Sequence, residues 1–382
     1  MASPDATRSA SGTVTLFLSG DVMTGRGIDQ ILPHPGDPRL YESYVKTARA
    51  YVQLAEEANG PFPQRVGYAY PWGDALAELE RRAPAARIVN LETAVTARGA
   101  PWPGKGIHYR MQPANVPCLS AAKLDCCIVA NNHILDWGPE GLADTLAALR
   151  GAGIQTAGAG SEELEAARPA VLKLARSGRV LVYAWGTESA GVPADWAAGT
   201  KRPGVNFLPG LTPATVSRIA SLVRRARQPG DLVVVSLHWG SNWGYAIPDE
   251  HRSFAHALID EAGADVVYGH SSHHPRGIEV YRGRPILYGC GDLINDYEGI
   301  RGYEMFRSEL ALLYFPSFEP HSRTMRALSM VPLRRRRLRL EHANGVDSAW
   351  LQQTLDRECR ALGCWVELAV DGALALRWQA AG

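Results

Sequence analysis

The sequence lacks an excess of charge of either sign. Its 40 lysines and arginines nearly balance its 39 aspartates and glutamates, which gives a formal net charge of +1 at pH 7. Nucleic acids and anionic membranes attract proteins through excess positive charge, and this chain has almost none. The basic run Arg334–Arg337 lies between apolar residues, which favours a strand with solvated arginines over a nucleic-acid signal. The composition therefore argues against a nucleic-acid partner.

Long apolar runs are also missing. The run Val14–Leu18 is much shorter than the roughly 18 apolar residues that a membrane-spanning helix needs. Residues 1–12 are small and polar, without the charged and apolar parts of a secretory signal, and this pattern is typical of a disordered tail. We therefore expect a cytoplasmic chain without a membrane anchor.

Cysteines are few and their spacing matches no zinc finger. Two of the six, Cys126 and Cys127, are neighbours inside an apolar run. A disulfide framework is unusual in a chain of this size, so we expect buried free thiols.

Short apolar segments alternate with amphipathic ones through most of the chain. Several of the apolar segments have no polar alternation, as expected for strands covered on both faces. This order predicts an α/β fold with mixed sheets. The expected strands are Val14–Ser19, Arg87–Asn90, Asp125–Ala130, Val180–Trp185, Leu232–Leu237, Asp265–Tyr268 and Pro285–Tyr288. The expected helices are Asp74–Arg82, Pro139–Ala152, Thr212–Arg227, Asp249–Glu261 and, near the end, Ser348–Leu362.

We expect one main domain over residues 13–340. Residues 341–382 are predicted to add a helix and short strands that pack on the same domain. The segment 33–72 is rich in tyrosine and proline and has a helix-like middle over Tyr41–Ala58. Its length and its place after the first strand are typical of a lid or an insertion.

Polar residues that suit a metal ion follow almost every predicted strand. Ligands of α/β sheets bind beyond the carboxyl ends of the strands, so these residues should converge on one site. Carboxylate and amide oxygens mixed with imidazoles suit Mn, Fe or Zn better than Mg or Ca. Two such ions would need a shared carboxylate, and Glu92 or Asp21 could serve. The strand ends in question are Gly20-Asp21, Asn90-Leu91-Glu92, Asn131-Asn132-His133, His238-Trp239-Gly240 and Gly269–His274.

Each of these motifs also has a structural explanation. Asp21 after a glycine is common in turns, Asn132 could cap a helix, and a single His238 could be a hydrogen-bonded core residue. The cluster of three histidines over residues 270–274 has little packing value, and it makes a purely structural explanation of the whole set weak.

Taken in order, these motifs resemble those of a known family. The resemblance runs from about residue 14 to residue 300 and is to the CapA family of capsule-synthesis proteins. The motifs that carry it are Gly-Asp-Val-Met at 20–23, Asn-Leu-Glu at 90–92, Ala-Asn-Asn-His at 130–133 with Asp136 and Gly138, His-Trp-Gly at 238–240, Gly-His-x-x-His at 269–273, and the segments 277–279 and 281–286.

The resemblance implies a four-layer α/β/β/α sandwich of the calcineurin-like metallophosphoesterase type with two divalent metal ions. Within it, His133 would be the general acid, which suits an imidazole near neutral pH. Asp136, three residues further on, would orient His133. The implied ligands of one ion are Asp21, Glu92 and His273. The implied ligands of the other are Glu92, Asn132, His238 and His270.

The sequence also departs from the wider superfamily. Met23 stands where a histidine ligand is usual, so one ion has a ligand fewer, and Glu92 replaces the usual bridging aspartate. Arg26 and Arg276 lie near the motifs and could clamp an anionic substrate group, or could equally be surface charges. Asp292 and Asn295 follow another strand and could support the ligands.

The resemblance implies a role in the synthesis of poly-γ-glutamate capsule or a related polymer. We expect a metal-dependent hydrolase of the phosphoesterase type, acting on a small-molecule or polyglutamate-type substrate, with polymer-synthesis enzymes as possible partners. Two alternatives stay open. One is a metal-containing accessory protein without turnover, and the other is a hydrolase of a small metabolite in an unrelated pathway.

Overall fold

The computed structural model describes residues 12–63, 66–175 and 178–379. The tail predicted over residues 1–12 lies outside these residues except for Gly12. Among the described residues, no helix is both long enough and apolar enough to cross a membrane.

The first sheet has ten strands and contains the N-terminal strand at its centre. β1 pairs parallel with β2 on one side and antiparallel with β17 on the other, so it is covered along both edges. The main path of this sheet runs β20 (Cys364–Leu368), β21 (Leu374–Trp378), β18 (Met325–Arg336), β17 (Leu310–Phe318), β1 (Val14–Val22), β2 (Ala86–Leu91), β5 (Cys126–Ile128) and β6 (Gln155–Ala157). Two further strands join it, β16 (Asp292–Ile294) beside β1 and β19 (Arg339–His342) beside β18.

The second sheet has seven strands, and its central part is parallel. Apolar runs fill these strands, as expected where both faces are covered. They are β11 (Phe207–Leu208), β9 (Arg179–Thr187), β12 (Leu232–His238), β13 (Val266–His270), β15 (Arg284–Leu287), β14 (Ile278–Tyr281) and β8 (Ala170–Lys173). Short pairs of β3 (Ala94–Val95) with β4 (Arg110–Met111), and of β7 (Ala159–Gly160) with β10 (Gly204–Val205), lie outside both sheets.

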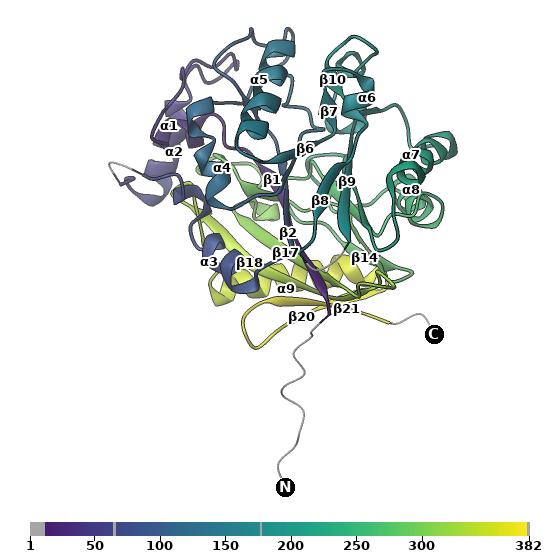
Figure 1. Ribbon diagram of the computed structural model, residues 1–382. Helices are drawn as coiled ribbons and strands as arrows, with labels where there is room; N and C mark the ends of the chain where they lie inside the picture. Colours follow the sequence, from purple (N-terminus) through teal and green to yellow (C-terminus); the bar gives the residue numbers. More distant parts are fainter. Residues whose placement is uncertain (1–11, 64–65, 176–177, 380–382) are drawn as a thin grey trace.

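The two sheets pack face to face. Alternate residues of β12 show this arrangement, because Val234 belongs to the core shared with the first sheet and Val235 packs on the other side against α7 (Pro213–Ala226) and α8 (Asp249–Asp260). The outer face of the first sheet is covered by α3 (Ala75–Arg82), α4 (Pro117–Ala121) and α5 (Gly138–Gly151), as Figure 1 shows. The expected α/β/β/α order of layers is therefore confirmed.

The C-terminal residues belong to the same packed body. β20 and β21 extend the first sheet, while α9 (Gly345–Arg360) contacts both β20 and β14 of the second sheet. The helix begins three residues earlier than expected, because the side chain of Asn344 caps it by accepting a hydrogen bond from the backbone of Asp347.

Two other expectations need correction. The helix predicted over Tyr41–Ala58 begins only at Arg49, where α2 (Arg49–Asn59) starts. The arginine run does lie at the end of β18, but Arg335 is 5% exposed and donates hydrogen bonds to the carbonyls of Asp292 and Leu293. The remaining short helices are α1 (Gly27–Ile31), α6 (Glu163–Ala166) and 3-10 turns at Tyr70–Trp72, Pro113–Asn115, Glu188–Ala190, Ala194–Trp196 and Glu304–Phe306.

Candidate metal centre

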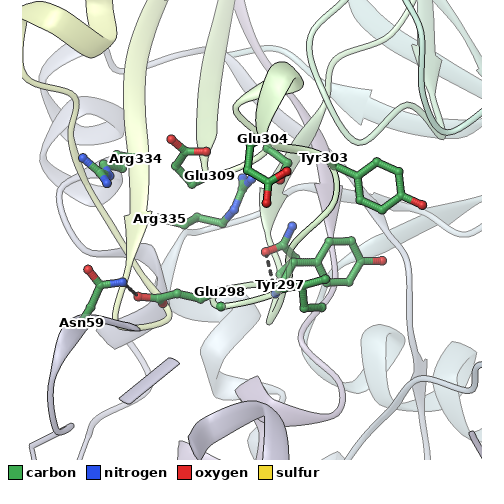
Figure 2. A pocket seen from close by; sticks show the side chains of 12 residues that line it. Asn59, Tyr297, Glu298, Tyr303, Glu304, Glu309, Arg334 and Arg335 are labelled. Atoms are coloured by element: carbon green, nitrogen blue, oxygen red, sulfur yellow. Dashed lines mark hydrogen bonds between the residues drawn. The ribbon is translucent and has the colours of Figure 1, made fainter. Parts of the chain in front are cut away.

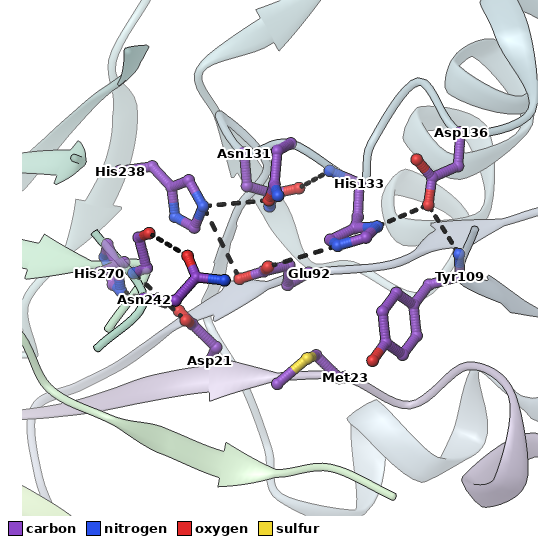
Figure 3. Close-up of polar contacts among 12 residues, drawn as sticks. Asp21, Met23, Glu92, Tyr109, Asn131, His133, Asp136, His238, Asn242 and His270 are labelled. Carbon is purple, nitrogen blue, oxygen red and sulfur yellow. Dashed lines mark hydrogen bonds and ion pairs between the residues drawn. The ribbon is translucent and has the colours of Figure 1, made fainter. Parts of the chain in front are cut away.

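The carboxyl ends of parallel strands from both sheets meet at one edge of the sandwich. In the first sheet Asp21 of β1 is in register with Asn90 of β2, and in the second His238 of β12 is in register with His270 of β13. Figure 3 shows the side chains from these strand ends pointing toward one another. The convergence expected from the sequence is therefore present.

Three of the predicted ligands form the centre of the cluster. Asp21, Glu92 and His238 each offer an atom within 4.8 Å of the others, and all three are buried. His238 Nε2 lies 4.0 Å from Glu92 Oε2 and 3.1 Å from Asn132 Oδ1. The carboxylates are further connected by Asn90, whose amide donates to Asp21 Oδ1 at 2.8 Å and to Glu92 Oε2 at 3.2 Å.

The two central carboxylates have no cationic partner of their own. Among the described residues, neither Asp21 nor Glu92 forms an ion pair with a lysine or an arginine. Burial raises the pKa of Glu92 well above its usual range, and the nearby charges of Asp21 and Asp292 raise it further. Burial also opposes ionisation of Asp21, but His270, His238 and Asn90 outweigh that effect and bring its pKa to about 2. Ionisation of Glu92 is therefore unfavourable in the protein without a bound cation, although the charge of Lys105 partly favours it.

The imidazoles of the cluster are suited to bind a cation. Burial lowers the pKa of His238 to about 3, so the ring is neutral at pH 7 and can offer a lone pair. The buried Nδ1 atoms of His238 and His270 have no hydrogen-bond partner. On its other side His270 Nε2 lies 2.9 Å from Ser236 Oγ, which fixes the ring, while Nδ1 faces Asp21 Oδ1 at 3.4 Å. Neutral imidazoles beside buried carboxylates, with His238 Nε2 4.0 Å from Glu92 and His270 Nδ1 3.4 Å from Asp21, fit a divalent metal ion.

His273 lies at the edge of this cluster. Its Nδ1 is 3.0 Å from Asp292 Oδ1, and Asp292 in turn accepts a hydrogen bond of 2.7 Å from Asn295. Metal-binding histidines are commonly held by a carboxylate in this way, which leaves the second ring nitrogen for the metal. The supporting positions anticipated for Asp292 and Asn295 agree with these contacts.

The loop after β5 brings a further histidine, His133, to the cluster. His133 Nδ1 lies 2.7 Å from Asp136 Oδ2, and His133 Nε2 lies 3.8 Å from Glu92 Oε1. Asp136 is held in turn by the backbone N–H of Tyr109, at 2.6 Å. Asn131, beside the predicted ligand Asn132, shapes the loop by accepting a hydrogen bond from the His133 backbone. The predicted pairing of His133 with Asp136 is therefore seen in the geometry.

Lys105 is a further polar residue at this site that sequence reasoning missed. Its Nζ lies 3.1 Å from His133 Nδ1 and bonds to Asp136 and to the carbonyl of Asn132. Burial first, and then the charge of Lys105, lower the pKa of His133 to about 4 against the opposing effect of Asp136. A single lysine in a glycine-rich loop gives no sequence signal of such a position.

The guanidinium of Arg26, predicted to bind substrate, has partners within the protein. Its guanidinium donates to Asp296 through Nε at 3.1 Å and to Glu42 and Tyr51 through Nη1 at 2.9 and 3.1 Å. The side chain is 3% exposed, so the alternative of a surface charge is also wrong. Because its donors are engaged by the protein, its contacts do not support the predicted clamp on substrate. Arg26 instead ties the segment 33–72 to the end of β1.

Arg276 and His274 contact residues of neighbouring loops. Arg276 is 2% exposed, not a surface charge, and donates to the carbonyl and hydroxyl of Ser241 at 2.7 and 3.0 Å. His274 stacks on Phe306 with 4.6 Å between ring centroids and contacts the ring of Tyr245 at the same distance.

Comparison with known proteins places this arrangement in a family. The family described as bacterial capsule synthesis protein PGA_cap matches residues 15–297. The chain belongs to this family. That span contains all the residues of the cluster, and the CapA resemblance read from the motifs is confirmed.

One relative of this chain has a high sequence identity to it. A protein of Mycobacterium tuberculosis (strain H37Rv) named "Probable polyglutamine synthesis accessory protein" is 51% identical over 362 residues, which cover 94% of this chain and 95% of that protein. The "PGA biosynthesis protein CapA" of Bacillus subtilis (strain 168) is 26% identical, over 72% of this chain and 62% of its own length. A solved phosphatase from Mycoplasma pneumoniae aligns with 84% of this chain at 11% identity and a TM-score of 0.44, which is too distant to support an argument.

Proposed function

We propose that this PGA_cap protein is a metal-dependent hydrolase of the phosphoesterase type that serves the synthesis of a polyglutamate or related capsule polymer. The family match and the names of the relatives support the link to polymer synthesis. The observation that carries the hydrolase proposal is the His133–Asp136 pair, held with His133 Nε2 at 3.8 Å from Glu92.

This pair is hard to explain in a site that only stabilises the fold. A structural metal site needs a closed set of ligands and gains nothing from a second, carboxylate-oriented imidazole beside one ligand. His133 is 7% exposed, and its Nε2 is directed at the cluster. An imidazole in this position can move a proton to or from a reacting group, which is the usual role of histidine in hydrolysis.

Each residue of the site would have a distinct role in hydrolysis. Asp21, Glu92, Asn132, His238, His270 and His273 would hold two divalent ions, of Mn, Fe or Zn. When bound, such ions supply a polarised phosphoryl oxygen and an activated water. Asp136 keeps the proton of neutral His133 on Nδ1, so that Nε2 can take up a proton and release it to the leaving oxygen. Lys105 balances the charge of Asp136 and fixes its position.

The test compares turnover and metal content in matched variants. The protein is stripped of metal, reloaded with Mn, Fe or Zn, and assayed on phosphomonoesters, phosphodiesters and γ-glutamyl amides. We expect His133→Gln to lower kcat by about 10²–10⁴-fold while metal content is unchanged. His256→Gln, on α8 outside the cluster, serves as the control and should keep wild-type turnover. Full turnover in His133→Gln would rule out the role assigned to His133.

A second candidate function is suggested by the name of the Mycobacterium tuberculosis relative, which describes that protein as an accessory protein. In this alternative the metal ions stabilise a subunit that supports a polymer synthase without turnover. Metal-loaded protein that hydrolyses none of the three bond types, yet retains its ions, would favour this candidate over a hydrolase.

A further inference from the structure

A cavity of about 200 Å³ opens beside His273 at the edge of the metal cluster. Most of its wall is aromatic, and we call it the aromatic cleft. The rings that line it are Tyr44, Tyr51, Trp243, Tyr297 and Tyr303. Two of them, Tyr44 and Tyr51, come from the segment 33–72, which therefore forms one wall of the space next to the predicted site of reaction.

Two of these rings are exposed, and a third, Trp243, packs against one of them. Tyr303 is 43% exposed and Tyr44 is 67% exposed, so both rings are accessible from solvent. Trp243 stacks on one face of Tyr303 with 3.9 Å between centroids and an interplanar angle of 6°. Phe306 and His274 pack around Trp243 in turn. Tyr303 is thus supported on one face by Trp243, and His274 belongs to that support.

The one arginine or lysine among the described residues that line the aromatic cleft is Arg26. Its guanidinium is already paired with Glu42 and Asp296. A second cavity of about 170 Å³ adjoins the cleft, because Tyr297 and Tyr303 line both. Figure 2 shows Arg334 and Arg335 in that cavity together with three carboxylates, those of Glu298, Glu304 and Glu309.

The charges in the adjoining cavity do not favour a chain of carboxylates as the occupant. A polyanion needs basic side chains along its path, and here carboxylates outnumber guanidiniums in the neighbouring cavity. An apolar cavity with a few polar groups is instead typical of a site for a neutral group of a small ligand. Flat aromatic side chains favour a partner with a flat or ring-shaped apolar face.

We propose that the aromatic cleft binds an uncharged ring of the substrate while the phosphoryl group of the same molecule reaches the metal cluster. Tyr303 and Tyr44 are the residues that determine specificity for the ring. This inference rests on the proposed function, since it assumes that the cluster binds the phosphoryl end. It makes the segment 33–72 one wall of the substrate site, and it implies that the substrate is a small ring-bearing phosphate ester instead of the polymer itself.

Binding of phosphonates tests this inference without depending on turnover, because their P–C bond is not hydrolysed. Isothermal titration of the manganese-loaded protein would compare phenylphosphonate, cyclohexylphosphonate and methylphosphonate. We expect the ring compounds to bind about tenfold more tightly than methylphosphonate, from burial of the ring's apolar surface. The ratio of phenyl to cyclohexyl affinity distinguishes an aromatic ring from a saturated ring.

Variants then locate the effect. Tyr303→Ala and Tyr44→Ala should each lower the preference for the ring compounds while methylphosphonate affinity is unchanged. Both side chains are exposed, so neither change should affect folding. Tyr41→Ala is the matched control, because Tyr41 is also exposed, at 48%, and lies on the same segment but lines a different cavity.

Several results would overturn the inference. These are equal affinity for ring and methyl compounds, an undiminished preference in Tyr303→Ala, or tighter binding of a γ-linked glutamate oligomer than of phenylphosphonate. Failure of the proposed function has a different signature. Preferential binding of ring compounds without any turnover would contradict the proposed hydrolase activity and leave the cleft assignment in place. Turnover without a preference for ring compounds would support the hydrolase and contradict the cleft assignment.

Discussion

Two groups of buried carboxylates lie near one another at the carboxyl ends of the strands, and they are neutralised in different ways. Glu42 and Asp296 share the guanidinium of Arg26, which ion-pairs with both. Among the described residues, Asp21 and Glu92 form no ion pair with a lysine or an arginine, and the amide of Asn90 and the neutral ring of His238 lie close to them. The first group carries its own counter-charge and the second does not.

The difference indicates which group is structural and which is built to take up a ligand. Burial opposes the charge of Arg26, but Asp296 outweighs it and raises the pKa of Arg26 well above its usual range, as in a permanent ion pair. Burial and neighbouring carboxylates instead raise the pKa of Glu92, so its charge is unfavourable in the protein alone. A buried carboxylate pair without a counter-ion is costly, and an external cation would remove that cost.

The largest expected effect on turnover comes from removing a charge from the second group, Asp21 and Glu92. Glu92→Gln keeps the shape of the side chain and removes its charge, so we expect turnover to fall below detection through loss of metal. In the metal-free state the same variant should be at least as stable as wild type, because an unfavourable charge is gone. Urea unfolding of both proteins in chelator measures this. Lower stability of the metal-free variant would contradict the comparison.

For the first group, Glu42 and Asp296, we expect a loss of stability when the charge of their partner is removed. Arg26→Met leaves two buried carboxylates without a cation, and we expect a loss of about 3–5 kcal/mol in the free energy of unfolding. The loss should be the same with and without metal. Arg39→Met, on the same segment but with a side chain that is 76% exposed, is the control and should change stability by less than about 0.5 kcal/mol. A small effect of Arg26→Met would mean that the two groups do not differ as described.

A smaller effect is expected from the support of His273. Asp292→Asn keeps a hydrogen-bond acceptor for the ring but removes the charge that favours the metal-binding tautomer. We expect metal affinity to fall by about 10–100-fold with little change in the metal-free protein. Competition with a fluorescent chelator measures the affinity, and Asp144→Asn, which pairs with Arg98 away from the cluster, is the control. Unchanged affinity would separate His273 from the metal centre.

Much of the fold and most of the cluster could be predicted because they depend on local patterns. Buried parallel strands are continuous apolar runs, and the ligands follow them directly in the chain, as Glu92 follows β2 and His270 ends β13. Residues at strand ends converge in any such sheet, so Asp21, Glu92 and His238 could be grouped without knowing their distances.

The parts that could not be predicted depend on contacts between distant segments. Lys105 reaches Asp136 from a loop 31 residues away in the sequence, and Arg26 finds Asp296 at a separation of 270 residues. Neither pairing follows from the residues around it. The same holds for Tyr303, which lines the aromatic cleft only because Trp243 stacks behind it. The surface-charge alternative for Arg26 was wrong for this reason, while its role toward a substrate stays a prediction.

The most direct test of the account is the metal content of the purified chain. Wild type, His238→Ala and the control His256→Gln would be stripped, reloaded with manganese, passed through a desalting column and analysed by mass spectrometry of the metal. We predict close to two ions per chain in wild type and in His256→Gln, with a clear loss in His238→Ala. No bound ion in wild type, or the same content in His238→Ala, would contradict the assignment of Asp21, Glu92 and His238 as a metal centre.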